Sequence, residues 1–126
     1  MGTPKPTPAE LGILRVLWER GPSTVRDVQE VLQRARPTGY TTVLKLLQIM
    51  TEKGLVTRDE NARAHVYEAR LGQSQTQRQL VRDLVDRVFA GSVSSLVMQA
   101  LSGRRTSPEE IAKIRLLLDR LEGGDR

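Results

Sequence analysis

Residues 39–67 read GYTTVLKLLQIMTEKGLVTRDENARAHVY, and this stretch decides the fold. Its first half carries an apolar face at helical spacing, made of Val43, Leu46, Leu47 and Met50. We expect a helix that begins at Gly39 or Tyr40, runs to Lys53 and is ended by Gly54, because glycine readily adopts the left-handed conformation that closes a helix.

The second half of this stretch changes character and shows two short strand signals. They cover residues 55–58 and 63–67, and the residues between them are turn formers. We therefore expect a β-hairpin with strands over these two ranges. Strand alternation would place Arg63 and His65 on the same face as Tyr67, which we expect to be partly buried.

Two further helices are predicted before this stretch. Thr7 can cap the first, with Pro8 at the first helical position and Glu10 closing a capping box. Thr24 can cap the second, which Pro37 ends because proline disfavours helical geometry in the residue before it. Three short helices followed by a hairpin are typical of a winged helix-turn-helix.

The remainder of the chain is predicted to be helical. A glycine and a polar run at residues 72–77 separate it from the first unit, and Ser92 and Ser107 are expected to cap its last two helices. We predict a mainly α fold with a small β-hairpin, divided into a winged helix-turn-helix over residues 7–71 and a three-helix dimerisation domain over residues 72–122.

These C-terminal helices carry more apolar side chains than one short chain can cover. The last helix carries an apolar series at spacings of three, four and three residues, as in a narrow coiled-coil seam. The series consists of Ile111, Ile114, Leu118 and Leu121. A chain of 126 residues buries a modest core, so uncovered apolar faces favour a partner subunit. We predict a homodimer formed through Leu84, Val88, Leu96, Leu101, Ile111, Ile114, Leu118 and Leu121.

The predicted winged helix indicates a nucleic-acid partner, because this fold places its third helix in the major groove and its wing on the DNA backbone. The net charge is +5 at pH 7, and no carboxylate occurs between Glu30 and Glu52, a window that includes most of the third helix. Threonine hydroxyls and methyl groups can contact phosphates and bases. The predicted surface for double-stranded DNA consists of Tyr40, Thr41, Thr42, Lys45, Arg63 and His65.

Each of these residues has a plainer interpretation that the sequence leaves open. Thr41 and Thr42 are also suitable helix-start residues, and Tyr40 could pack rather than bind. Lys45 is also what a solvated helix face carries, and His65 is compatible with a structural role. The distribution of charge, rather than any single residue, therefore indicates the site.

Residue counts exclude several other classes of function. The chain has no cysteine and one histidine, which removes disulfides, thiolate metal sites and Ser–His nucleophiles. Residues 91–95 lack the second glycine of a nucleophile elbow, and residues 38–40 lack the ending of a phosphate loop. No apolar run approaches the roughly 20 residues of a membrane span. We expect a cytoplasmic protein that is not an enzyme, holds no metal or cofactor and does not insert into a membrane.

Several short motifs occur in a specific order along the chain. They are AEL at 9–11, VLW at 16–18, TVRDV at 24–28, YTTVL at 40–44, EKGLV at 52–56, HVY at 65–67, TQR at 76–78, FAGS at 89–92 and IRLL at 114–117. Each is modest alone, but their order and spacing over about Thr7 to Leu121 resemble the penicillinase repressors of the BlaI/MecI type.

This resemblance implies a bacterial dimeric repressor on a palindromic operator, often built on TACA and TGTA half-sites. Carried over by position, the third-helix contacts would be Thr41, Thr42 and Lys45, with Arg63 on the wing. Members commonly work with a membrane sensor that has a cytoplasmic metalloprotease domain, and cleavage of the repressor ends repression. The repressor would be cytoplasmic, and associated with the nucleoid when bound to DNA.

Two features depart from well-known members of the family. Where those members have an Asn–Phe bond that is cut, this chain carries the cleavage-equivalent bond Gln99–Ala100. Copper-responsive relatives end in paired cysteine motifs, so the absence of cysteine excludes a copper–thiolate sensor. The sequence leaves two alternative functions open, a small-molecule-responsive regulator of the MarR kind and a winged-helix protein–protein adaptor.

Overall fold

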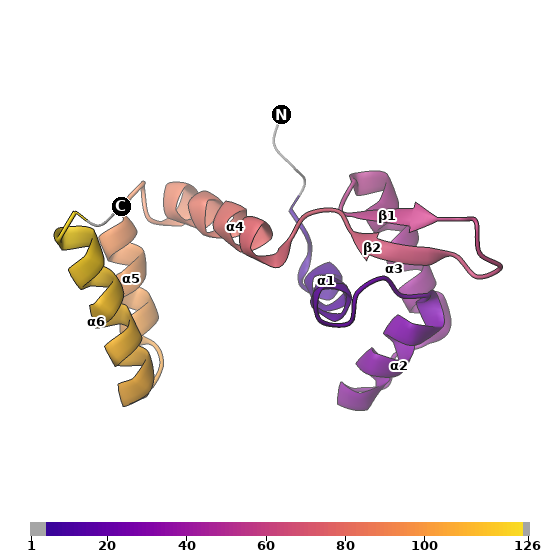
Figure 1. The fold of residues 1–126 in the computed structure, drawn as a ribbon, viewed down its shortest axis with the longest axis horizontal. Coiled ribbons are helices and arrows are strands. Elements are labelled where there is room, and N and C mark those ends of the chain that lie inside the picture. The colour runs from indigo at the N-terminus through magenta and orange to yellow at the C-terminus, as the bar shows by residue number, and fades with distance from the viewer. Residues whose placement is uncertain (1–4, 125–126) are drawn as a thin grey trace. The chain divides into compact units, whose positions relative to one another are not determined.

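A computed structural model describes residues 5–124 of the chain, and within them it contains six helices and one two-stranded sheet (Figure 1). In chain order the elements are α1 (Pro8–Arg20), α2 (Val25–Ala35), α3 (Tyr40–Lys53), β1 (Val56–Asp59), β2 (Val66–Ala69), α4 (Gln73–Val88), α5 (Val93–Ser102) and α6 (Pro108–Glu122). The predicted mainly α fold, with a winged helix-turn-helix at its N-terminal end, is confirmed.

The first two helices begin where the capping residues predict. The Thr7 hydroxyl accepts the Glu10 N–H at 3.2 Å, and the Glu10 carboxylate accepts the Thr7 N–H at 2.9 Å. Thr24 and Asp27 form the same reciprocal pair at 3.1 and 3.0 Å. The C-terminal end of α3 is also where the sequence predicts it, because Gly54 follows the helix with a left-handed φ of 81°.

Both strands of the hairpin lie further along the chain than predicted: β1 begins one residue late and β2 begins three residues late. The strands pair antiparallel with Asp59 opposite Val66 as the last pair, so residues 60–65 form a loop. The predicted placement of Arg63 and His65 on a strand face is therefore wrong: both lie exposed in this loop. The Asp59 side chain supports the start of this loop, because its Oδ1 accepts the Asn61 N–H at 2.9 Å directly after the last ladder pair.

A short backbone bridge joins the hairpin to the helices. Ser23 and Tyr67 exchange two hydrogen bonds, with the Ser23 N–H donating at 2.9 Å and the Tyr67 N–H donating at 2.7 Å. Tyr67 is 1% exposed, so it is fully buried rather than partly buried as expected. The bridge fixes the root of the wing beside the start of α2.

One apolar core holds the three N-terminal helices and the hairpin together. Its fully buried members are Ile13, Leu14, Val16, Leu17, Val25, Val28, Val43, Leu47, Met50, Leu55, Val56 and Tyr67. Helix α2 contributes Val25 and Val28 to this core, whereas Ala35 in its last turn is exposed. This core makes a rigid support for the outer face of α3.

Contacts within the chain divide it into two compact units, one ending at Val81 and the other beginning at Arg82. The polar run expected to separate the units is helical instead, because α4 already begins at Gln73. Glutamine is a good helix former, and Thr76 is 6% exposed, so this first part of α4 packs onto protein rather than forming a loop.

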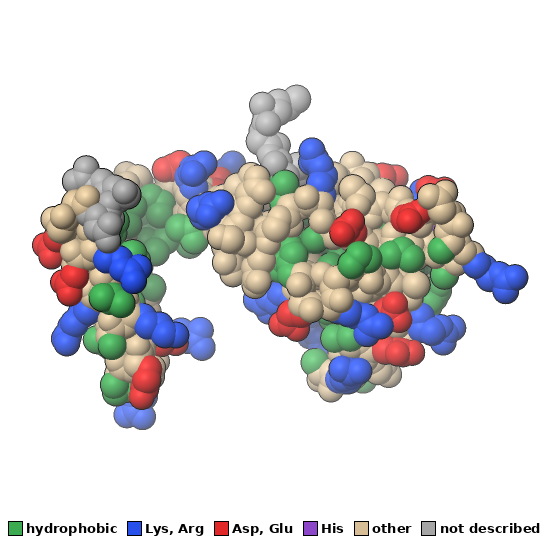
Figure 2. All heavy atoms as spheres, in the orientation of Figure 1, with side chains coloured by type: hydrophobic (Ala, Val, Ile, Leu, Met, Phe, Trp, Pro, Cys, Tyr) green, Lys and Arg blue, Asp and Glu red, His purple; other side chains and the backbone are tan. Residues whose placement is uncertain are grey.

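The second unit is far less closed than the first. Neither α5 nor α6 buries a residue completely. Many large apolar side chains there are exposed, and Figure 2 shows hydrophobic surface over these C-terminal helices. The exposed set consists of Leu84, Val88, Val93, Val97, Met98, Leu101, Leu116, Leu117, Leu118 and Leu121.

Among the described residues, no single helix is long and apolar enough to cross a membrane. Helices α4 and α5 reach the length and apolar composition of a membrane span only when they are counted together, and a bend of 100° separates them.

Candidate nucleic-acid interface

The N-terminal half of α3 presents a polar face opposite its buried one. Tyr40 is 46% exposed, and Thr41, Thr42 and Lys45 are also exposed. The other side of the same turns buries Val43 completely. The helical period of 3.6 residues places Thr41, Thr42 and Lys45 together on the outer face, whereas Tyr40, three positions before Val43, lies at the border of the buried face.

Side-chain hydrogen bonds fix the turn between α2 and α3. The Gln29 Nε2 donates to the Thr38 carbonyl at 3.0 Å, and the Gln33 Oε1 accepts the Thr38 N–H at 2.8 Å. The Thr38 hydroxyl donates to the Arg36 carbonyl at 2.9 Å. These bonds hold both sides of the turn, and so they fix the direction in which α3 leaves α2.

An open hollow of about 410 Å³ lies between the start of α2, the start of α3 and the loop of the hairpin, residues 60–65, here called the wing loop. Its lining consists of Thr24, Val25, Arg26, Tyr40, Leu44, Arg63, Ala64, His65 and Tyr67. The structure thus brings Tyr40, Arg63 and His65 together around one hollow. Thr41, Thr42 and Lys45 do not line it and instead stay on the outer face of α3.

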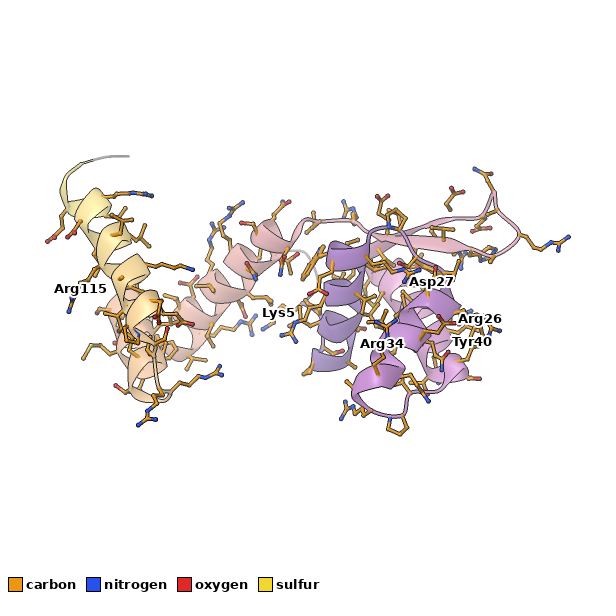
Figure 3. All side chains as sticks on the ribbon, turned by 60° about the horizontal axis from the view of Figure 1, so that its bottom comes forward. Lys5, Arg26, Asp27, Arg34, Tyr40 and Arg115 are labelled. Carbon is orange, nitrogen blue, oxygen red and sulfur yellow. The ribbon has the colours of Figure 1, made fainter. Side chains whose placement is uncertain are left out.

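Arg26 is a candidate residue that the sequence reasoning missed. Its guanidinium lies over the Tyr40 ring, 6.0 Å from the ring centroid, and Figure 3 shows the two side chains together. A helical wheel could have found it, because Val25 and Val28 turn inward and leave Arg26 on the outer surface.

Cations around this surface have no carboxylate partners. Within residues 5–124 none of the exposed side chains in this set forms an ion pair: Arg26, Arg34, Arg36, Lys45 and Arg63. The carboxylate of Asp27 is already neutralised by Arg20 at 3.2 Å. Hydrogen bonds from Thr24 lower the pKa of Asp27, with a further contribution from the charge of Arg20. The Asp27 carboxylate therefore stays ionised and paired with Arg20. The surface is therefore basic in three dimensions as well as in sequence.

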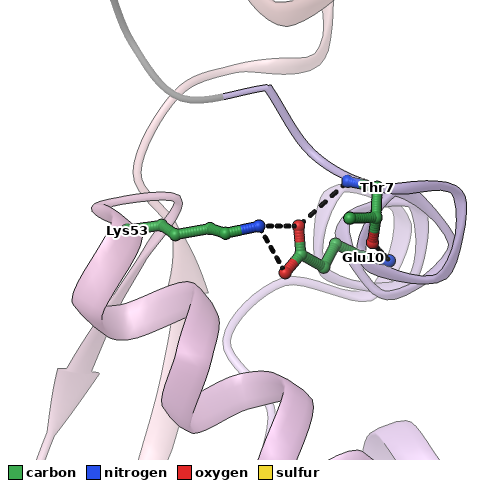
Figure 4. Close-up of polar contacts among 3 residues, drawn as sticks. All are labelled: Thr7, Glu10 and Lys53. Atoms are coloured by element: carbon green, nitrogen blue, oxygen red, sulfur yellow. Dashed lines mark hydrogen bonds and ion pairs between the residues drawn. The ribbon is translucent and has the colours of Figure 1, made fainter.

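A buried ion pair supports α3 from behind (Figure 4). Lys53 donates to both oxygens of Glu10, at 2.9 and 3.0 Å, and the Glu10 side chain is 2% exposed. Burial alone would raise the pKa of Glu10, but hydrogen bonds from Lys53 and Thr7 outweigh it and lower the pKa below its ordinary 4.5. The pair ties the end of α3 to the start of α1.

The candidate dimer residues all lie in the poorly closed unit. Leu96, Ile111 and Ile114 are half-buried, whereas the other five are exposed. Gln99 and Ala100, the cleavage-equivalent bond, are exposed near the end of α5 and are helical. No cluster of His, Asp or Glu suited to a metal ion occurs in the part of the chain that the structure describes.

Comparison with known proteins identifies the family. The family model of the penicillinase repressor matches residues 6–120. The chain belongs to the penicillinase repressor family. The match covers both units, so the resemblance seen in the short motifs is confirmed.

Curated relatives of this penicillinase repressor family member are transcriptional regulators and repressors. The transcriptional regulator BlaI of Mycobacterium tuberculosis (strain H37Rv) is 32% identical over 91% of this chain and 83% of its own length. The penicillinase repressor of Bacillus licheniformis is 22% identical over 92% and 91%. The methicillin resistance regulatory protein MecI of Mammaliicoccus sciuri is 20% identical over 89% and 91%. These names describe regulators, not enzymes, in agreement with the prediction from the sequence.

Proposed function

We propose that this protein is a cytoplasmic transcriptional repressor that binds double-stranded DNA as a homodimer on a palindromic operator. The observation that carries the proposal is the exposed polar face at the start of α3, surrounded by cations without carboxylate partners. Phosphates approaching this face meet little repulsion. The regulator and repressor names of the relatives support the same function.

In this proposal α3 enters the major groove. Thr41 and Thr42 reach base edges and phosphates through their hydroxyls, and their methyl groups can meet the methyl group of thymine. Lys45, one turn further along, donates to a guanine or to a phosphate. Arg63 and His65 lie on the wing loop and contact the backbone, which positions the protein without reading sequence.

The proposed dimer explains why the second unit leaves apolar side chains uncovered. Single exposed apolar residues are ordinary on a monomer, but ten large ones within 38 residues are a feature of protein interfaces. A second copy would cover Leu84, Val88, Leu96, Leu101, Ile111, Ile114, Leu118 and Leu121. A symmetric dimer then places two α3 helices on two half-sites, which accounts for a palindromic operator.

We propose that repression ends when a membrane sensor-protease, activated by a signal, leads to cleavage of the C-terminal unit. Proteases bind extended backbone, so cutting at Gln99–Ala100 requires the end of α5 to unwind. Helix α5 has no fully buried residue, so a single chain resists this unwinding weakly. Cleavage there would remove α6 from the proposed dimer and weaken operator binding.

Selection of binding sites from fragmented genomic DNA, with the winning sites titrated at two salt concentrations, tests the proposal. We expect a two-fold symmetric site whose affinity falls roughly 10³–10⁵-fold between 50 and 200 mM salt, as for 6–10 phosphate contacts. Recovery of sequence-blind binding alone would contradict a repressor and favour a winged-helix adaptor.

A further inference from the structure

We propose that the hollow between α2, α3 and the wing loop (residues 60–65) binds one sugar–phosphate unit of the DNA backbone, with Arg26 and Arg63 on the phosphate. This inference rests on the proposed function, and it adds a residue, Arg26, for which the sequence comparison gives no role. It also gives Tyr40 a role as the positioning residue for Arg26 rather than as a base contact.

The chemistry of the hollow matches both parts of a nucleotide backbone unit. Its floor is apolar, because Val25 and Tyr67 are buried there and Leu44 is partly buried. Its rim is basic, because Arg26 and Arg63 are exposed. A deoxyribose is suited to the apolar floor, and the phosphate attached to it is suited to the rim. The volume of about 410 Å³ falls in the range of small-molecule sites.

The position of Arg26 is set before any ligand arrives. Its guanidinium lies 6.0 Å from the centroid of the Tyr40 ring, a distance at which the ring face attracts a cation. An arginine already held in place loses less side-chain entropy on binding than a free one. The stacked guanidinium still has donors at its edge, and these can reach a phosphate in the bidentate geometry that arginine favours.

The charges that face the hollow are unbalanced. Arg26 and Arg63 form no ion pair within the described residues. Glu30, one turn after Arg26 on α2, forms no ion pair among the described residues but does not line the hollow, and two other neighbouring acidic groups have partners elsewhere. Asp27 pairs with Arg20, and Glu60 in the wing loop pairs with Arg58 at 2.8 Å. An anion is therefore the ligand that this rim lacks.

The test is the salt dependence of DNA binding by the full chain, measured by fluorescence anisotropy for wild type and Arg26→Gln. Each neutralised phosphate contributes about 0.9 to the slope of log affinity against log salt, so two hollows in a dimer predict a slope lower by about 2. The affinity should fall on the selected operator and on a scrambled duplex by the same factor, because a backbone contact reads no sequence.

Arg15→Gln is the matched control. Arg15 is exposed on α1 and does not line the hollow, so this variant removes the same charge and should leave the slope close to wild type. Equal slopes for wild type and Arg26→Gln would overturn the proposal, as would a loss confined to the operator. If the wild-type chain binds no DNA at all, the proposed function itself fails.

Two further arms separate the remaining explanations. Tyr40→Phe keeps the ring and should keep the wild-type slope, whereas Tyr40→Ala should lower the slope even though Arg26 is intact. Inorganic phosphate, added without DNA, distinguishes a backbone phosphate from a free one. A rise in Tm with phosphate that disappears in Arg26→Gln, together with an unchanged DNA slope, would assign the hollow to free phosphate and overturn the backbone assignment.

Discussion

Replacing Lys53 with Met should destabilise the protein at neutral pH and much less in acid. The substitution keeps a long unbranched side chain, one atom shorter than lysine, but leaves the Glu10 carboxylate, 2% exposed, without its cation. Removing one partner of a buried pair costs about 3–5 kcal/mol. Lys53 is 32% exposed and water can partly replace it, so we expect a loss of about 2–3 kcal/mol at pH 7.

The pH dependence gives this prediction its sign. In wild type the pKa of Glu10 is below 4.5, so the pair contributes its full stability above about pH 4.5 and loses it as the pH falls through the lowered pKa. In Lys53→Met the loss of the cation raises that pKa relative to wild type, because burial then opposes only the hydrogen bonds with Thr7. The variant therefore carries a penalty at neutral pH that disappears once the carboxylate is protonated. The difference between the two proteins should shrink below about pH 4.

Urea unfolding followed by circular dichroism, at one protein concentration and at pH 7 and 3, measures both effects. With a slope of about 2 kcal/mol per M, the midpoint should fall by roughly 1–1.5 M at pH 7. Lys113→Met on α6 is the matched control, because Lys113 is exposed and has no ion pair among the described residues. An equal loss at both pH values would refute the electrostatic reasoning and assign the effect to packing.

Three other variants test separate parts of the structure. Thr42→Glu combined with Lys45→Glu should abolish operator binding in a gel-shift assay while the protein remains dimeric, because both side chains are exposed and only the DNA face changes sign. Leu118→Asp should convert the dimer to monomer in sedimentation experiments and weaken DNA binding, and a variant that stays dimeric would place the interface elsewhere. Trp18→Phe removes the 2.9 Å hydrogen bond from the indole N–H to the Leu71 carbonyl, so urea unfolding should show a loss of about 1–2 kcal/mol.

Elements with local signals were predictable from the sequence. Thr7 and Thr24 begin their helices as expected, since a capping box is formed by residues only three positions apart. Gly54 ends α3 for an equally local reason, a left-handed backbone conformation that glycine adopts without strain. Such interactions are encoded in neighbouring residues, so periodicity and capping rules suffice to find them.

Elements decided by distant contacts were not predictable in the same way. The start of β2 depends on the bridge between Ser23 and Tyr67, which are 44 positions apart, and on the Asp59 turn. Pattern alone therefore placed Arg63 and His65 in a strand. The polar run of α4 was misjudged for a related reason, since the burial of Thr76 depends on tertiary packing.

The candidate site also has a part that neighbouring residues predict and a part that depends on distant contacts. Thr41, Thr42 and Lys45 were predictable because they sit at fixed angles on one helix whose buried face is evident. The hollow was not, because it needs three elements at once, and Arg26 gains its meaning only when Tyr40 from the next helix lies beneath it. A helical wheel finds exposed residues, but it does not show which of them face each other.

The two units also differ in what a single chain can complete. The N-terminal unit buries twelve apolar residues in one core, and the starts of α1 and α2 are capped by its own side chains. In the C-terminal unit α5 and α6 also have side-chain caps, with Ser92 accepting the Ser95 N–H and Ser107 accepting the Glu110 N–H, yet neither helix buries a residue fully. Good caps define where a helix begins, but most helical stability comes from packing of an apolar face. Well-defined helices without a closed core are what a sequence selected for assembly would show, and in the proposed homodimer a symmetric partner would supply the missing packing from residues the chain already has.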